Sequence, residues 1–269
     1  MGFFSTLRAI RESPLSATTK KALRRTYLAM TVRKTVAPPL ESARVCNFDV
    51  SFCSFPIMWM LFKDVFVSNE YFFHSENPNP TILDCGSNIG MSVLYFKLIH
   101  KGARITAFEP DPAAFACLEK NIANNRLEGV QAFQKAVARH AGPVELFDDP
   151  ALPGSPITSI RADRGGPRRR VFDAVSLSTY VSGAIDMLKL DVEGAEIDVL
   201  EDLAAAGALP RIRQMVIEYH HHMSPGDDRL SKALGILEVA GFRYQIGCHT
   251  PDPLARDVFQ DILIRAYRA

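Results

Sequence analysis

Short apolar runs alternate with segments of helical periodicity from residue 81 onward. Two apolar runs are expected to be strands buried in a sheet, Thr81–Cys85 and Ala103–Phe108. A helix is expected between them, from Gly90 to His100. Asp111 followed by Pro112 predicts the start of the next helix, because they are a good N-cap and a good first helical residue. This alternation predicts a mostly parallel sheet with helices on both faces.

The same pattern continues towards the C-terminus. A further helix is expected to end near Gly207 and another at Gly241. The last two strands have no helix between them, so we expect them to pair antiparallel. The segment Asp148–Arg170 is rich in Pro, Gly and Arg and is expected to be a long surface loop. The other expected strands are Val130–Lys135, Pro143–Phe147, Ala184–Asp191, Gln214–Tyr219, Phe242–Gly247 and Val258–Ala266.

Three segments of different composition divide the chain. Residues 1–45 hold nine Lys or Arg against two Glu and form a basic N-terminal extension, with one helix expected from Ser16 to Lys34, before Pro38-Pro39. Residues 46–80 are rich in aromatic side chains and are expected to be a helical lead-in that covers the cleft. Residues 81–269 are expected to form the catalytic domain.

Two interpretations of the basic extension stay open. It is either a solvated, partly frayed segment or a weak contact for a membrane surface or an acidic partner.

Overall composition excludes several classes of protein. With 47% hydrophobic and 23% charged residues, the chain is expected to be globular, and its net charge of +1 gives no sign of specific nucleic-acid binding. The five cysteines include no CxxC pair, which argues against a disulfide scaffold and favours a reducing, cytoplasmic location. No apolar run approaches the ~20 residues that span a bilayer.

A glycine-containing turn and an acidic residue mark the first candidate site. Asp84-Cys85-Gly86-Ser87-Asn88-Ile89-Gly90 lies between a strand and a helix, where glycines allow a close approach to a ligand. Glu109 ends the next strand, about 20 residues further on, where an acid binds a ribose diol. Asp84 disfavours a pyrophosphate and suits a cofactor that carries an amino group, such as S-adenosylmethionine.

Acidic and histidine residues at two later strand ends form the second candidate site. Asp191 follows an apolar strand and is expected to face the cleft, whereas Glu193 and Glu196 are in position to cap the following helix. Glu218 and His220 share one face of the strand that ends in His220-His221-His222. These residues offer groups that can take a proton from a hydroxyl.

With these motifs the chain resembles S-adenosylmethionine-dependent methyltransferases, and more narrowly the FkbM family. The resemblance covers roughly residues 60–265 and is most specific at Leu188-Lys189-Leu190-Asp191-Val192-Glu193-Gly194-Ala195-Glu196. It implies a Rossmann-like class I methyltransferase fold, an α/β fold whose mostly parallel seven-stranded sheet has an antiparallel last strand. It also implies O-methylation of a small-molecule or glycan acceptor, such as a sugar or another hydroxylated metabolite. The further matching residues are Asp64-Val65-Phe66, Glu70-Tyr71, Asp84-Cys85-Gly86-Ser87-Asn88-Ile89-Gly90 and Phe108-Glu109-Pro110.

The expected roles divide between cofactor binding and proton transfer. We expect His220 to act as general base, because its ordinary pKa suits neutral pH, with Asp191 as the other candidate and Glu218 orienting the imidazole or placing the acceptor. No metal is expected to be needed. The expected cofactor-binding residues are Asp84, Gly86, Ser87, Asn88, Gly90, Glu109, Pro110, Lys135, Ala136 and Asp191.

Two functions of other classes remain as alternatives. One is a non-catalytic nucleotide-binding or interaction module, and the other is a nicotinamide-dependent oxidoreductase. Binding of S-adenosylhomocysteine but not of NAD would exclude the second.

Overall fold

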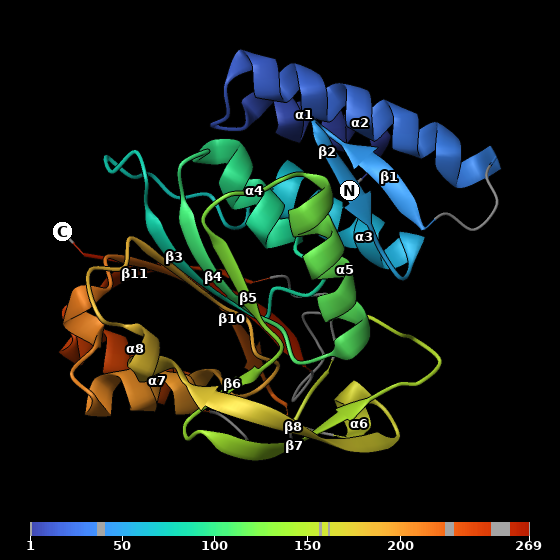
Figure 1. Ribbon diagram of the computed structural model, residues 1–269. Helices are drawn as coiled ribbons and strands as arrows, with labels where there is room; N and C mark the ends of the chain where they lie inside the picture. The colour runs from blue at the N-terminus through green and yellow to red at the C-terminus, as the bar shows by residue number, and fades with distance from the viewer. Residues whose placement is uncertain are drawn as a thin grey trace, which may run out of the picture.

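A seven-stranded sheet forms the centre of the protein. The computed structural model describes residues 2–36, 41–155, 158–160, 162–223, 229–248 and 259–268. The strand order is β11-β12-β10-β9-β3-β4-β5 (Figure 1). Strands β10, β9, β3, β4 and β5 are parallel, and β12 is antiparallel to both its neighbours, which confirms the predicted reversed last strand. The bounds are β3 Thr81–Cys85, β4 Arg104–Phe108, β5 Val130–Phe133, β9 Met187–Leu190, β10 Gln214–His221, β11 Arg243–Cys248 and β12 Gln260–Tyr267.

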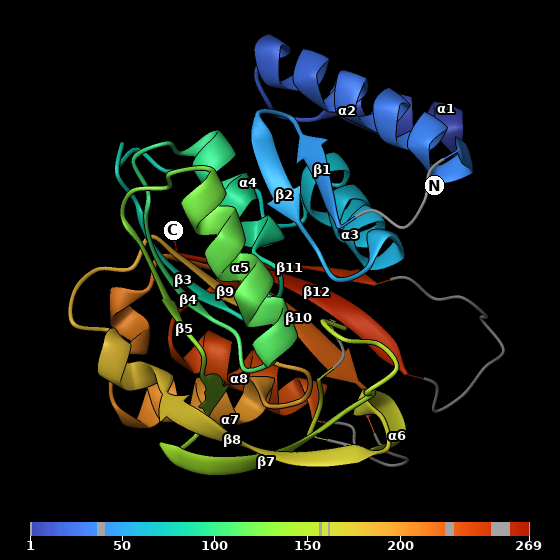
Figure 2. The same cartoon turned by 45° about the vertical axis from the view of Figure 1, so that its right-hand side comes forward.

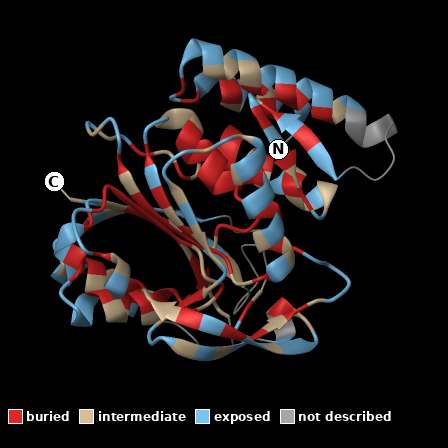
Figure 3. Cartoon of the chain, viewed as in Figure 1, coloured by how far each residue is buried: buried red, intermediate tan, exposed pale blue. Residues whose placement is uncertain are grey.

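Helices cover both faces of this sheet, as the alternating pattern predicts. Helices α4 and α5 lie on one face, and α7 and α8 lie on the other (Figure 2). Successive strand residues therefore enter different cores: Ile82 packs with the α4 side, whereas Leu83 packs with the α7 side. Colouring by burial shows mostly red inner strands between the helices, whereas the edge strands β5 and β11 hold no buried residue (Figure 3). The bounds are α4 Met91–Ile99, α5 Pro112–Asn124, α7 Glu196–Ala205 and α8 Leu230–Val239.

Local signals for two of these helices are confirmed. The carboxylate of Asp111 accepts hydrogen bonds from the backbone N–H groups of Ala113 and Ala114, at 3.0 and 2.9 Å, as a helix N-cap does. On α7, the predicted inner residues Ile197 and Leu200 are buried. Val258, the predicted first residue of the last strand, lies outside the described residues.

The N-terminal segment folds as two helices against the domain. Ile10, Leu23 and Met30 are buried and belong to the same core cluster as α4 and α5. The ring of Tyr27 stacks on that of Trp59, with 5.6 Å between centroids. The expectation of a solvated, frayed extension is therefore wrong for the inner faces of these helices. The bounds are α1 Phe3–Glu12, which was not predicted, and α2 Ala17–Val36, which confirms the expected helix.

The aromatic lead-in continues directly from these helices. A hairpin of β1 and β2 spans the expected boundary at residue 45, while the division into three segments stays a prediction. Two successive helical pieces then carry a row of stacked rings that runs from Trp59 through Phe62 to Phe66. The bounds are β1 Ser42–Val45, β2 Phe48–Ser51, α3 Phe55–Leu61 and the π-helix η1 Phe62–Val67; Pro38-Pro39 lies outside the described residues.

A second, three-stranded sheet of order β6-β8-β7 lies below the carboxyl ends of the central strands (Figure 1). The expectation of a loop from Asp148 to Arg170 is wrong at its C-terminal end, because β8 begins at Arg168. Arg168 pairs with Asp148 through two contacts of 2.7 Å, so its charge is compensated across the strands. The bounds are β6 Ala136–Ala138, β7 Gly142–Asp148, α6 Ala162–Gly165, β8 Arg168–Ser176, and the 3-10 helices η2 Leu177–Tyr180 and η3 Leu209–Arg211.

Among the described residues, no helix combines the length and apolar character needed to cross a membrane.

Candidate active site

Two glycines at left-handed backbone angles shape the loop between β3 and α4. Gly86 has φ +81°, and a Cβ there would lie 1.8 Å from the backbone oxygen of Asp191. Gly90 has φ +87°, and a Cβ there would lie 2.7 Å from Leu118 Cδ1. Only glycine therefore fits at either position without displacing a neighbour. The loop consequently lies directly against the carboxyl end of β9.

Asp84 lies beneath this loop and is completely buried. Its Oδ2 accepts a hydrogen bond of 2.6 Å from Ser92, whereas Oδ1 has no hydrogen-bond partner among the described residues. Burial raises the pKa of this carboxyl above its ordinary value. The nearest cation is the Lys189 ammonium, 3.9 Å from Oδ1. Asp84 therefore lies under the loop and next to the buried ammonium of Lys189.

Glu109 ends β4 and faces the same loop. Its Oε2 accepts from the backbone N–H of Asn88 and its Oε1 from that of Asp111, both at 2.8 Å. The side chain is buried, and this burial raises the pKa of Glu109 to about 7. Ser87 also supports the loop, since its hydroxyl donates to the Asp84 carbonyl at 3.0 Å. The carboxylate is thus fixed in one orientation by the backbone around it.

A cavity of about 170 Å³ lies between this carboxylate and the small sheet. The sequence-predicted residues Gly86, Glu109 and Asp191 line one side, and Pro110, Lys135 and Ala136 continue the wall. Ser87 and Asn88 line a smaller adjoining cavity, and Gly90 packs on Leu118 instead. Strands β6 and β7 and their neighbours add an apolar wall that was not predicted. This wall consists of Val137, Ala138, Val144, Leu146 and Ile160, and Thr158 also lines the cavity.

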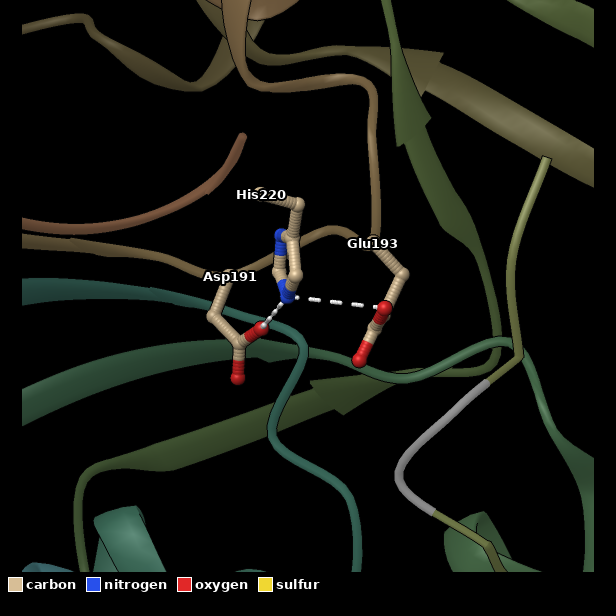
Figure 4. A group of neighbouring side chains, drawn as sticks. All are labelled: Asp191, Glu193 and His220. Atoms are coloured by element: carbon tan, nitrogen blue, oxygen red, sulfur yellow. Dashed lines mark ion pairs between the residues drawn. The ribbon is translucent and has the colours of Figure 1, made fainter. Parts of the chain in front are cut away.

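Asp191, Glu193 and His220 converge at the edge of this cavity (Figure 4). The imidazole Nε2 of His220 lies 3.4 Å from Glu193 Oε2 and 3.8 Å from Asp191 Oδ1. Glu193 has φ +52°, an uncommon angle for a residue with a side chain, in the turn that precedes α7. Asp191 and Glu193 also line the cavity, so the cluster borders the space expected for the cofactor.

Glu196 fixes the orientation of the His220 ring. Its Oε1 lies 2.8 Å from His220 Nδ1 and also accepts from the backbone N–H of Gly194 at 2.9 Å. Burial lowers the pKa of His220, but the carboxylates of Glu196 and Glu193 outweigh this effect and raise it well above its ordinary value. The premise that His220 keeps an ordinary pKa is therefore wrong. Glu196, not Glu218, is its orienting partner.

Lys189 is a buried cation that was noted only as part of the family resemblance and was given no role, because it lies within an apolar strand. Its Nζ donates to Asp191 Oδ2 at 2.9 Å and to the carbonyl oxygens of Gly86 and Cys85. Although burial disfavours the ammonium, the carboxylates of Asp191 and Asp84 raise the pKa of Lys189 above its ordinary value. The ammonium therefore joins the glycine loop to the end of β9.

Glu218 lines a larger cavity of about 970 Å³. Tyr71 donates its hydroxyl to Glu218 Oε1. Burial and the nearby Asp191 raise the pKa of Glu218 to about 8. The larger cavity is also lined by Glu70, and burial with the neighbouring Asp64 raises the pKa of Glu70 to about 7. Tyr71 and Glu70 were noted only as part of the family resemblance, so sequence reasoning gave them no role.

The chain matches known methyltransferases in sequence. The family described as "Methyltransferase FkbM domain" matches residues 84–244. Methyltransferase 1 of Beauveria bassiana (strain ARSEF 2860) is 30% identical over 223 residues, which cover 75% of this chain and 87% of that protein. The 31-O-demethyl-FK506 methyltransferase FkbM of Streptomyces tacrolimicus is 30% identical over 215 residues, which cover 68% and 80%. The 2-O-methyltransferase NoeI of Sinorhizobium fredii (strain NBRC 101917 / NGR234) is 31% identical over 144 residues, covering 46% and 58%.

A solved structure agrees with the fold. The methyltransferase FkbM from Methylobacillus flagellatus KT superimposes with a TM-score of 0.50 at 17% sequence identity. The match covers 98% of this chain but 58% of that protein, so this chain spans little more than half its length. The family match and the sheet order together establish the fold class predicted from the sequence. The chain therefore belongs to the FkbM family of methyltransferases, whose cofactor is S-adenosylmethionine.

Proposed function

We propose that this protein methylates a hydroxyl group of a sugar, a glycan or another hydroxylated metabolite. One observation carries the proposal: the Asp191 side chain lines the same cavity as Glu109 and lies near the side chains of His220 and Glu218. Two relatives carry names that agree with this chemistry, since one is a 31-O-demethyl-FK506 methyltransferase and the other a 2-O-methyltransferase.

The described residues fit S-adenosylmethionine. A Cβ at Gly86 would collide with the backbone oxygen of Asp191. The backbone of the glycine loop therefore lies close to the space in front of β3 and β9. Glu109 presents a fixed carboxylate beside an apolar wall, which suits a ribose diol next to an adenine ring. Asp191, which lines the same cavity, provides negative charge for an amino group or a sulfonium. When bound, the cofactor supplies an activated methyl group.

Residues of this chain then have to place the acceptor and receive its proton. We assign Asp191, Glu218 and His220 to the surroundings of the acceptor hydroxyl, because the Asp191 carboxylate lies beside both other groups. Lys189 and Glu196 act as positioning residues: Lys189 holds Asp191 Oδ2 and Glu196 holds the imidazole. Fixed polar groups of this kind favour one orientation of a bound hydroxyl and reduce the cost of aligning it with the methyl group.

Methyl transfer to a panel of hydroxylated acceptors tests the proposal. We expect S-adenosylhomocysteine and an O-methylated product to form with at least one glycan, polyol or polyketide, as detected by mass spectrometry. Asp191→Asn is expected to lower kcat by about 100-fold, within the range for proton-transfer groups. The exposed Asp49→Asn variant is the matched control and should retain wild-type turnover. Methylation confined to nitrogen, sulfur or carbon acceptors would refute the proposal.

A further inference from the structure

We propose that Asp191, Glu193 and His220 form a binding site for a divalent transition-metal cation such as Mn²⁺. From the sequence alone no metal is expected to be needed, and the possible ligands are Asp191 and Glu218, with Glu193 as a possible third. The folded chain instead brings together one oxygen each from Asp191 and Glu193 and a nitrogen of His220, all within 4.8 Å of one another.

The distances from His220 Nε2 to the two carboxylates suit a shared ion. A cation with ligand bonds of about 2.1 Å holds its ligand atoms about 3.0 to 4.2 Å apart, depending on the angle between them. His220 Nε2 lies 3.4 Å from the Glu193 oxygen and 3.8 Å from the Asp191 oxygen, inside that interval. In Figure 4 the two carboxylates approach the same nitrogen of the ring. A cation can therefore bridge them after small side-chain adjustments.

The ring of His220 is already oriented as metal-bound imidazoles usually are. A histidine that binds a metal through one nitrogen commonly donates the other N–H to a carboxylate. Here Nδ1 lies 2.8 Å from Glu196 Oε1, which is itself held by the backbone N–H of Gly194. Glu196 thereby fixes the tautomer that leaves Nε2 towards Asp191 and Glu193.

The charge around the ring provides a second, independent reason. Four carboxylates approach the imidazole, the fourth being Asp261, 3.8 Å from Nε2. Two cations offset part of this charge: Arg164 donates to Glu193 Oε2 at 2.6 Å and lies 3.7 Å from Asp261, and Lys189 donates to Asp191 Oδ2 at 2.9 Å. A dication reduces the remaining excess of negative charge. The hydrogen bond from Arg164 to Glu193 is compatible with a bound dication, because the Glu193 carboxylate offers several acceptor positions.

The mixed donor set indicates the kind of metal. Imidazole suits transition metals, whereas Mg²⁺ and Ca²⁺ prefer sites made of oxygen. Three ligands from the protein leave further coordination positions open, and Asp191 and Glu193 both line the cofactor cavity. This part of the inference rests on the proposed function: an acceptor hydroxyl in an open position would be polarised by the cation.

Titration of the full-length, EDTA-treated protein with Mn²⁺ alone tests the site. Electron paramagnetic resonance of free Mn²⁺ should show one bound ion per chain, and pulsed measurements should show coupling to a ligating nitrogen. His220→Ala should abolish the nitrogen coupling and weaken binding by tenfold or more, and Glu193→Gln should weaken binding while retaining the coupling. The exposed His140→Ala variant is the control and should bind like wild type.

Several results would overturn the site. Absence of bound Mn²⁺ at millimolar concentration would do so, as would nitrogen coupling that survives in a folded His220→Ala protein. The wild-type nitrogen coupling does not require any variant to fold, so it decides the question if the substitutions are unstable. Failure of the site is distinguishable from failure of the proposed function, because O-methylation after EDTA treatment without Mn²⁺ binding would refute the metal alone.

Discussion

The ionisation of Glu109 should control how tightly the cofactor binds. Its two oxygens accept backbone hydrogen bonds of 2.8 Å, and its side chain is 5% exposed. Burial raises its pKa from 4.5 to about 7, so at pH 6 the isolated protein holds it mainly as the neutral acid. Ribose hydroxyls donate best to the carboxylate, because hydrogen bonds to a charged acceptor are the stronger ones. We therefore expect bound S-adenosylhomocysteine to favour the charged form.

The sign and size of the effect follow from this raised pKa. A rise in the pKa of Glu109 from 4.5 to about 7 means that folding disfavours its ionised form by roughly 3 kcal/mol. This group therefore lowers the stability of the free protein as pH rises from 4.5 to about 7. Cofactor affinity depends on pH in the opposite direction, because binding requires the charged form of Glu109. Affinity should rise with pH up to about 7, by as much as tenfold per pH unit, and then level off.

Calorimetric titration with S-adenosylhomocysteine between about pH 5.5 and 8.5 measures this dependence. Below pH 7, binding should release a proton, which is detected by comparing two buffers of different ionisation enthalpy. Glu109→Gln should lose the pH dependence and bind at least tenfold more weakly, because its NH₂ group would face a backbone N–H. Loss of one hydrogen bond to a charged group costs about 1.5–3 kcal/mol, or about 10- to 150-fold in Kd.

The exposed residue Glu119 lies on α5 and provides the control. Glu119→Gln should keep the wild-type affinity and the wild-type pH dependence. The reasoning would be refuted by a wild-type affinity that is flat from about pH 5.5 to 8, or by a folded Glu109→Gln protein that binds like wild type.

Three further predictions concern the scaffold of the site. Leu23→Ala should lower the free energy of unfolding by about 2–5 kcal/mol in urea titrations, because Leu23 is fully buried, whereas the exposed Leu28→Ala should change it by less than about 0.5 kcal/mol. Gly86→Ala should abolish S-adenosylhomocysteine binding in calorimetry, since its Cβ would lie 1.8 Å from a backbone oxygen, whereas Gly235→Ala has open space and should bind normally. Lys189→Met should lower the free energy of unfolding by about 3–5 kcal/mol, and with it the melting temperature, because it leaves two nearby carboxylates without their cation.

The central sheet and the strand-end residues could be predicted from local signals alone. Apolar runs and helix-start residues such as Asp111 act within a few positions, so one sequence contains them. Glu109 and Asp191 could be located for the same reason: each follows a recognisable strand, and parallel strands bring their carboxyl ends to one edge. The sequence also distinguishes the antiparallel last strand, because no helix separates it from β11.

Burial that depends on distant partners could not be predicted in this way. The basic N-terminal segment looked solvated because its charges dominate, yet Leu23 and Met30 pack with residues beyond position 45. Strand β8 was missed because it begins with three arginines. Arg168 is tolerated there because Asp148 lies opposite it on β7, a pairing that only the folded sheet shows.

The turn after β9 explains why motif recognition located the site but did not assign its partners. Along a strand, alternate residues share a face, so Lys189 and Asp191 point the same way and form an ion pair. The alternation then stops, because Glu193 adopts φ +52° and Gly194 φ +111°. This reversal turns Glu193 back towards His220, and it lets Glu196 reach the other side of the ring. Spacing alone suggested that both glutamates cap a helix. Their approach to one imidazole follows from two left-handed residues, and the proposed cation site depends on the same two angles.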